Sequence, residues 1–215
     1  MVGESERYQL DKQLYTGPIE SWSGLDRTLD RPVTIRLLDP DSEIGKRVQL
    51  QARSLTRLEH SALLHVLDTV EVGGKFGLVT ESLPERNLEE YLSLNGTISL
   101  SEALTFAIQL GEALAALHSA GFVIGDLQAK HVGHRSDGTV VIVEGPPTGD
   151  ANKIPARPED DIASLGELIH ELLVGFRPQF DHQGQHELHP SITPPVQQIV
   201  RRSIDRDDQW SGASA

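Results

Sequence analysis

Cysteine is absent from the 215 residues of this chain, and no apolar run reaches the length of a membrane span. Without cysteine the chain can form neither disulfides nor thiolate metal sites, which fits a reducing compartment. A membrane helix needs about 20 predominantly apolar residues, and the polar start Met1–Ser5 does not resemble a secretory signal. We therefore expect a soluble, cytoplasmic domain that meets a membrane only as part of a larger parent protein.

Positive charge is also scarce. The chain has 19 Lys and Arg against 32 Asp and Glu, a formal net charge of −13. Nucleic acids are bound by concentrated basic surfaces, so this balance excludes nucleic acid as the expected partner. With 38% hydrophobic and 24% charged residues, the composition is that of a globular chain with room for one large domain or two small lobes.

The first 82 residues have the pattern of a sheet with one helix. Apolar and polar residues alternate along Val33–Leu37, which predicts a strand, and helical spacing of apolar residues predicts a helix over Ile44–Leu58. The predicted strands include Tyr8–Leu14, Pro32–Leu38, Leu63–Val72 and Gly77–Ser82. We expect a small antiparallel lobe of about five strands.

Helices predominate after Ser82. The strongest is Ser101–Ala120, for which Ser101 is the predicted N-cap. Its apolar stripe is expected to be buried and consists of Leu104, Ile108, Leu110, Leu114 and Leu117. Asp161–Val174 is equally apolar along one side, and shorter helices are predicted over Leu88–Leu94 and Pro195–Ile204. The order of elements predicts an α+β chain of two lobes.

One segment carries a family resemblance. Ala120–Gly145, AGFVIGDLQAKHVGHRSDGTVVIVEG, resembles the catalytic loop and metal-binding strand of protein kinases, A-G-I-V-H-R-D-L-K-P-x-N followed by D-F-G. Further landmarks stand in the family's order. Val33–Arg36 is similar to V-A-I-K, and Leu50–Leu55 is similar to the C-helix pattern R-E-A-R-x-L. Leu78–Leu83 is similar to the hinge. The segment that begins at Asp161 is similar to the central helix of the family.

The resemblance implies a bilobal protein-kinase-like fold. Residues 1–83 would form the N-lobe, an antiparallel sheet plus one helix, and residues 84–215 a helical C-lobe that is truncated at its C-terminal end. The positions that would line the nucleotide cleft are Gly17, Arg36, Thr80, Glu81 and Leu83, with Thr80 as gatekeeper.

Several positions that carry chemistry in kinases hold other residues here. Arg36 stands in place of the phosphate-holding lysine and Gln51 in place of its glutamate partner, so the usual ion pair cannot form. Gln128 replaces the lysine that neutralises the transferred phosphoryl group. His131 replaces an asparagine metal ligand, and imidazole is a poor ligand for magnesium. Asp126 keeps the position of the catalytic base.

The phosphate-binding region departs from the family as well. Gly17 remains of the Gly-rich loop, but Pro18 removes an amide and Glu20 brings a negative charge. Glu144 stands where the D-F-G aspartate belongs and could still reach a metal. Only about sixteen residues separate it from Asp161, and no A-P-E stands at the proper distance. We expect a shortened activation segment.

These substitutions predict a pseudokinase, which is not an enzyme, holds no cofactor or metal, and serves as a protein-interaction module. In this interpretation Asp126 bonds neighbouring amides and Asp161 holds the catalytic loop from below. Two roles stay open for Arg36, a salt bridge to Glu144 or Asp126 and a contact with phosphate. The alternative function is a weakly active or nucleotide-binding Ser/Thr protein kinase, with Asp126 as base and Glu144 on the metal.

Within the pseudokinases the chain most resembles the cytoplasmic domain of the actinobacterial lipid II flippase of MviN type. The likeness lies in L-D-R-x-V at Leu29–Val33, in Leu38–Asp41 and in Glu159–Ile162. It implies that an active Ser/Thr kinase phosphorylates the domain and that a forkhead-associated domain binds the phosphothreonine, in the control of peptidoglycan precursor export. Thr148 and Thr193 are the candidate acceptors, in Pro-rich loops.

Overall fold

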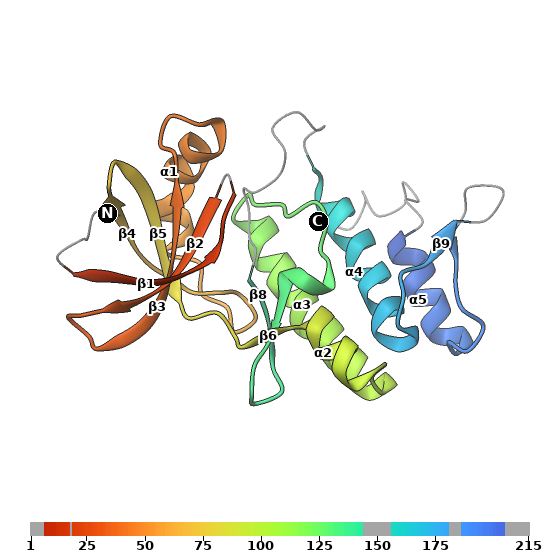
Figure 1. Cartoon of the computed structure of the whole chain (residues 1–215). Coiled ribbons are helices and arrows are strands. Elements are labelled where there is room, and N and C mark those ends of the chain that lie inside the picture. The colour runs from red at the N-terminus through yellow and green to blue at the C-terminus, as the bar shows by residue number, and fades with distance from the viewer. Residues whose placement is uncertain (1–6, 18, 144–155, 181–185, 205–215) are drawn as a thin grey trace.

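The computed structural model describes residues 7–17, 19–143, 156–180 and 186–204. Figure 1 shows two lobes, with the sheet formed by the N-terminal part of the chain and most helices in the C-terminal part. The sheet lobe contains β1 (Tyr8–Tyr15), β2 (Ile19–Asp26), β3 (Arg31–Leu38), α1 (Glu43–Leu55), β4 (Val66–Val72) and β5 (Lys75–Glu81). The strands are antiparallel in the order β1-β2-β3-β5-β4. The predicted α+β class and antiparallel lobe are confirmed.

The middle of the sheet explains its stability. β3 lies between β2 and β5, and its side chains Val33, Ile35 and Leu37 are almost fully buried. Thr34, on the opposite face of the same strand, is buried as well. A strand covered on both faces contributes apolar area on each of them, about 25 cal/mol per Å² of buried surface. The sequence pattern predicted only one buried face for β3.

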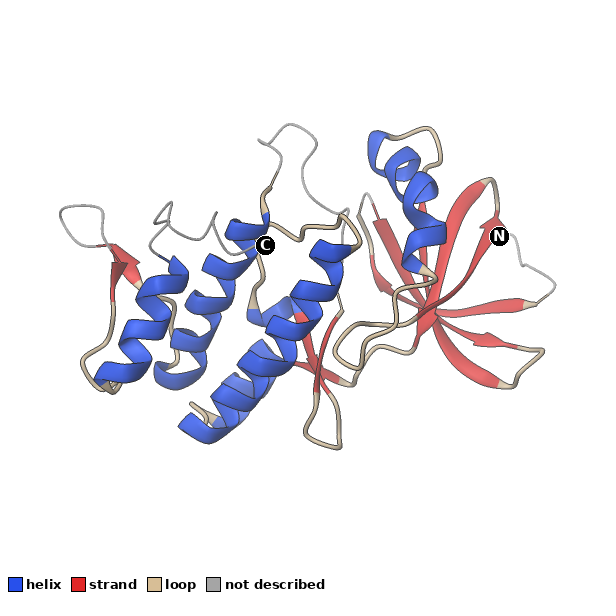
Figure 2. Ribbon diagram, turned by 180° about the vertical axis from the view of Figure 1, so that it is seen from behind, coloured by secondary structure: helices blue, strands red, loops and turns tan. Residues whose placement is uncertain are grey.

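Helix α1 begins at Glu43, one residue before the predicted start, and ends at Leu55, three residues before the predicted end Leu58. The Ser42 hydroxyl accepts a hydrogen bond from the Gly45 amide at 3.0 Å and so caps the helix. A Cβ at Gly45 would lie 1.9 Å from the Asp39 carbonyl oxygen, so only glycine fits this first turn. In Figure 2, which views the molecule from behind, α1 lies beside the strands of its lobe, where it packs against β5.

The second lobe is mainly helical. Its elements are β6 (Arg86–Asn87), α2 (Leu88–Asn95), α3 (Leu100–Ser119), the 3₁₀ turn η1 (Ala129–His131), β7 (Val132–His134), β8 (Val140–Ile142), α4 (Pro158–Val174), β9 (Gln179–Phe180), β10 (His186–Glu187) and α5 (Pro194–Ile204). Helix α4 packs between α3 and α5. The core where α3 and α4 meet contains the buried side chains of Phe106, Leu110, Leu114, Leu168 and Leu172.

The details of α3 differ from the prediction. Ser99, and not Ser101, caps the helix by accepting from the Glu102 amide at 3.2 Å. Leu104 and Ile108, expected to be buried, are 36% and 62% exposed. The buried stripe is Ala103, Phe106, Leu110, Ala113, Leu114 and Leu117. Small alanines allow the neighbouring helix a close approach, so packing selects the face that carries them.

Within the part of the chain that the structure describes, α3 is also long and apolar enough to be considered as a membrane span, with a mean hydropathy of 1.3. Its buried face packs into the core of the second lobe. The core helix of a folded domain passes the same test, so this single helix is weak support for membrane insertion.

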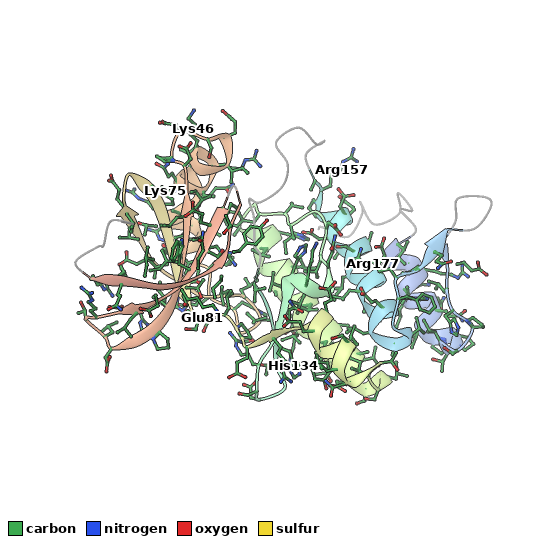
Figure 3. All side chains as sticks on the ribbon, viewed as in Figure 1. Lys46, Lys75, Glu81, His134, Arg157 and Arg177 are labelled. Atoms are coloured by element: carbon green, nitrogen blue, oxygen red, sulfur yellow. The ribbon has the colours of Figure 1, made fainter. Side chains whose placement is uncertain are left out.

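Hydrogen bonds near the β5–β6 connection join the two lobes. We call this set of hydrogen bonds the interlobe anchor. Arg135, in the β7–β8 turn, donates to the Glu81 carboxylate at 2.8 Å and to the Ser61 carbonyl at 2.7 Å. The Ile142 amide of β8 donates to the Ala62 carbonyl at 2.9 Å. Glu81 lies between the lobes in Figure 3. Residues of both lobes therefore share one hydrogen-bonded edge.

A buried histidine makes the fold sensitive to acid. His170 in α4 is fully buried, its Nδ1 donates to the Phe176 carbonyl at 2.9 Å, and its Nε2 accepts from the His189 amide at 3.0 Å. These bonds need the neutral ring, and burial lowers the pKa of His170 below its ordinary 6.5. The folded state therefore binds fewer protons than the unfolded state below pH 6.5.

Stability should accordingly fall as pH drops below 6.5. We expect His170→Asn to lower the melting temperature at neutral pH but to reduce its dependence on pH. Thermal denaturation across this range, monitored by circular dichroism, measures both effects. The exposed His65 provides the control, His65→Gln, which should keep the wild-type pH dependence. An unchanged slope in His170→Asn would contradict the assignment.

Candidate active site

A cavity of about 1010 Å³ lies between the two lobes. Its walls come from β1, β2 and β3, from the connection after β5, and from the loop of residues 123–131, which we call the Asp126 loop. Ligand pockets commonly measure about 300–1,000 Å³, so a nucleotide fits this space. The predicted site residues that line it are Arg36, Leu83, Asp126 and His131.

Three residues predicted for the cleft have other surroundings. Gly17 lies close under the Tyr15 ring, with 2.6 Å between a Cβ built on it and Tyr15 Cε1. Thr80 is buried within β5, and the side chain of Glu81 belongs to the interlobe anchor. Of the three residues predicted from the hinge segment, Leu83 lines the cleft. Thr80 packs within the sheet, and Glu81 bonds the second lobe.

The Asp126 loop is held from below by α4. The carboxylate of Asp161 is fully buried, accepts from the backbone amides of Ile124 and Gly125, and lies 2.8 Å from His118 Nε2. The Ser164 hydroxyl accepts from the Leu127 amide at 3.0 Å. The expectation that Asp161 supports the loop is confirmed. The bonds to the Ile124, Gly125 and Leu127 amides fix the loop backbone, so they position the side chains that the loop carries.

Gly125 shows why the loop departs from the kinase pattern. Its φ is +92°, a region that side chains other than glycine rarely adopt. A Cβ at this position would also lie 2.7 Å from the Ala156 Cβ. In H-R-D the arginine stands at this position, directly before the aspartate, so an arginine does not fit here without a change in the backbone.

Asp126 presents its carboxylate to the cavity. The side chain is 57% exposed, accepts a hydrogen bond from the Gln128 side-chain amide, and lies 3.5 Å from Arg177 Nη1. His131 Nδ1 lies 3.1 Å from the Asp126 carbonyl oxygen and 3.3 Å from the Gln128 amide nitrogen, and its tautomer decides which bond forms. His131 thus braces the loop. Asp126 bonds side chains rather than the backbone amides that were expected.

Arg36 spans the cavity from the sheet lobe. Its guanidinium donates to the carbonyl oxygen of Val143, on the far side of the cleft. Glu144, one of the two partners predicted for Arg36, lies outside the described residues, as does Thr148. Gln51 in α1 has a buried side-chain carbonyl oxygen without a hydrogen-bond partner in the described part of the chain. The positive charge at position 36 is therefore fixed across the cleft without help from position 51.

The expected effect of Glu20 on phosphates is wrong. Its carboxylate forms an ion pair with Lys75 and accepts from Trp22 Nε1 at 3.4 Å, and the Lys75 contact lowers the pKa of Glu20. Ile19 and Ser21 line the cavity instead. Successive side chains of a strand point to opposite faces, so Glu20 faces away from the cleft.

The cavity wall also contains a hydroxyl that no sequence motif marks. Thr34 of β3 lines the cavity, and its Oγ1 accepts from the Leu83 amide at 3.2 Å. The Thr80 hydroxyl donates to the Glu81 carbonyl at 2.9 Å. Backbone groups in an apolar cleft orient a ligand only if they are free to bond it. Here two such groups of the hinge segment bond threonines of the adjoining strands.

This arrangement predicts a gain of affinity. Thr34→Ala should strengthen ATP binding by about fivefold, because a hydrogen bond that competes with the ligand is worth about 1 kcal/mol. Isothermal titration calorimetry with ATP measures the change. The exposed Thr69 of β4 supplies the control, Thr69→Ala, which should bind as the wild type does. Equal affinity of all three proteins would show that the Leu83 amide plays no part in binding.

Comparison with known proteins decides the family. Residues 15–144 match the model of the protein tyrosine and serine/threonine kinase family, more than half of the chain. The match contains β2 to β5, the connection between the lobes and the Asp126 loop. This chain belongs to that kinase family. The bilobal kinase-like fold is thereby confirmed.

Similar proteins include three bacterial kinases. The serine/threonine-protein kinase PknL of Mycobacterium tuberculosis is 28% identical over 80% of this chain and 50% of its own length. The probable serine/threonine-protein kinase PknB of Corynebacterium glutamicum is 29% identical over 65% of this chain and 23% of its own. PrkC of Bacillus subtilis, also a serine/threonine-protein kinase, is 23% identical over 94% and 38%. The chain spans about half the length, or less, of these curated relatives.

These relatives overturn one expectation. The prediction that the chain is not an enzyme is wrong, because its relatives are named Ser/Thr protein kinases, which are enzymes. The kinase landmarks in the sequence identified the family correctly. The error lay in treating substituted positions as proof that catalysis is lost.

The groups available for a kinase reaction are set by the described residues. A nucleotide fits the cavity, with Arg36 and Leu83 in its walls. Among the described residues, no group of three His, Cys, Asp or Glu is placed to hold a metal ion.

Proposed function

We propose that this kinase domain is a slow Ser/Thr protein kinase that binds ATP in the interlobe cavity. The observation that supports it most is Asp126, an exposed carboxylate at the cavity on a loop whose backbone is fixed by α4. ATP, when bound, supplies the phosphoryl group for transfer. Asp126 accepts the proton of the substrate hydroxyl, as a general base must lie within hydrogen-bond reach of that proton.

Several residues make the expected turnover low. Gln128 offers an uncharged amide to Asp126, so the Asp126 loop brings no cation to the transferred group from this position. His131 bonds the loop itself. Arg36 is engaged with the Val143 carbonyl and must exchange that bond for a phosphate contact. Phosphoryl transfer depends on positioning and on neutralising charge, so each of these reduces the rate without removing the base.

The test is phosphoryl transfer to a Ser/Thr protein substrate from radiolabelled ATP. We expect measurable turnover in the wild type and a loss of at least about a hundredfold in Asp126→Asn, the usual scale for a general base. The control is Asp41, an exposed residue just before α1. Asp41→Asn removes the same charge and should retain turnover. Absence of turnover in the wild type, or turnover that survives Asp126→Asn, would refute the proposal.

A second proposal concerns the chain as a substrate. Thr193 is exposed, and its carbonyl accepts from the Val196 and Gln197 amides, so it stands at the start of α5. A phosphate at a helix start is favoured by the amides and dipole there. We propose that an active Ser/Thr kinase phosphorylates it in the cytoplasm and that a forkhead-associated domain binds the product, in control of peptidoglycan precursor export. Thr148 remains a second candidate acceptor.

Mass spectrometry after incubation with an active Ser/Thr kinase tests this second proposal. Phosphate on Thr193, and binding of a forkhead-associated domain that is lost in Thr193→Ala, are the expected results. Binding that is unaffected by Thr193→Ala would assign the site elsewhere.

A further inference from the structure

Arg177, in the segment between α4 and β9, reaches the Asp126 loop although no sequence motif connects them. Its Nη2 donates to the Leu127 carbonyl at 2.7 Å, and its Nη1 to the Glu167 carboxylate at 2.7 Å. The same Nη1 lies 3.5 Å from Asp126 Oδ1. Figure 3 shows Arg177 at α4, in the second lobe. The guanidinium is thus shared between the loop backbone, the candidate base and the central helix.

Both backbone groups of Leu127, its amide and its carbonyl, are hydrogen-bonded by α4 and the segment that follows it. The Leu127 amide donates to Ser164, in α4, and the Leu127 carbonyl accepts from Arg177. The side chain before it is held as well, since Asp126 has Arg177 near one carboxylate oxygen and Gln128 on the other. Position and orientation of Asp126 therefore depend on a residue that follows it by 51 positions.

The charges around Arg177 give it a further role. Asp126, Glu167 and Glu171 all lie within 3.5 Å of its guanidinium. Burial raises the pKa of Glu171, and the Arg177 charge opposes that rise. Without the guanidinium the three acidic groups would face each other, and like charges at such distances repel. The arginine fork can bond several oxygens at once, which a lysine ammonium does with less geometric control.

We propose that Arg177 is a positioning residue for phosphoryl transfer, which holds Asp126 in the orientation that accepts the substrate proton. This inference rests on the proposed kinase activity. Arg177 does not line the cavity, so its effect passes through the Asp126 loop and not through the nucleotide. A misplacement of a reacting group by about 1 Å can reduce a rate by about a hundredfold.

Kinetics of Arg177→Ala and Arg177→Lys test the role. We expect kcat to fall by about a hundredfold in the alanine variant, with the KM for ATP unchanged, and less in the lysine variant. Low millimolar guanidinium should restore part of the turnover of Arg177→Ala. The exposed Arg202 provides the control, and Arg202→Ala should match the wild type in both constants. Unchanged kcat in Arg177→Ala, or an equal fall in Arg202→Ala, would overturn the inference.

Amide hydrogen exchange separates this inference from the proposed activity. In Arg177→Ala we expect faster exchange in the peptide that contains Leu127, while peptides of the sheet lobe exchange as in the wild type. Unchanged exchange around Leu127, or acceleration throughout the chain, would contradict a local positioning role. If the wild type shows no phosphoryl transfer, the kinase proposal fails, and this measurement still decides whether Arg177 holds the loop.

Discussion

Replacing Asp161 by alanine is expected to have the largest effect on stability of any single change in the second lobe. The variant would leave the part-buried amides of Ile124 and Gly125 without an acceptor and remove the partner of His118. An unsatisfied buried donor costs about 1–3 kcal/mol, so the loss should reach about 3–5 kcal/mol. Urea denaturation measures the free energy of unfolding directly, and the melting temperature should fall by roughly 10 °C.

The neighbouring Glu159 offers a matched control. It is exposed in the first turn of the same helix, and Glu159→Ala should cost no more than about 1 kcal/mol through the helix dipole. Asp161→Asn, which retains one acceptor oxygen, should fall between the two. Similar stabilities for Asp161→Ala and Glu159→Ala would show that the Asp126 loop does not depend on this carboxylate.

Introducing a lysine at position 128 is expected to raise phosphoryl transfer by about a hundredfold, the usual scale for one well-placed charge in a transition state. The Gln128 side chain already reaches the Asp126 carboxylate, so the ammonium of a lysine at this position would also lie close to that carboxylate. Its ammonium would neutralise charge on the transferred group. Initial rates with radiolabelled ATP under identical metal and substrate concentrations measure the gain.

Two variants make that result interpretable. Gln128→Met removes the hydrogen bond to Asp126 without adding charge, and its turnover should not exceed that of the wild type. Gln128→Lys combined with Asp126→Asn should lose the gain, because the base is still required. A rate in Gln128→Lys no higher than in Gln128→Met would mean that charge at this position does not limit transfer.

Local sequence patterns predicted most of the fold because they depend on local physics. Strand alternation located β3, and the predicted strands Leu63–Val72 and Gly77–Ser82 overlap β4 and β5. The exposed face of α3 was the main error. Leu104 and Ile108 are as apolar as the buried residues, and only the neighbouring helix α4 decides which side of such a helix is covered.

The candidate site was predictable only where a motif spans a short stretch of chain. Asp126 and Asp161 could be located from their surroundings in the sequence, and the structure brings them together through two backbone amides. Arg177 could not, because its contact with Asp126 depends on the course of the chain after α4. Thr34 was interpreted as an outward strand residue, since alternation does not reveal a strand buried on both faces.

The interlobe anchor has a consequence for how a ligand leaves the cavity. Arg135 ties Glu81 and Ser61 to the second lobe, so the lobes resist separation along that edge. Departure then depends on displacement of the β1–β2 hairpin, which covers the cavity from the other side. Hairpin and loop motions take nanoseconds to microseconds, faster than the opening of whole domains. The residence time of a bound nucleotide would therefore be set by its contacts in the cavity, and very little by the rate at which the two lobes separate.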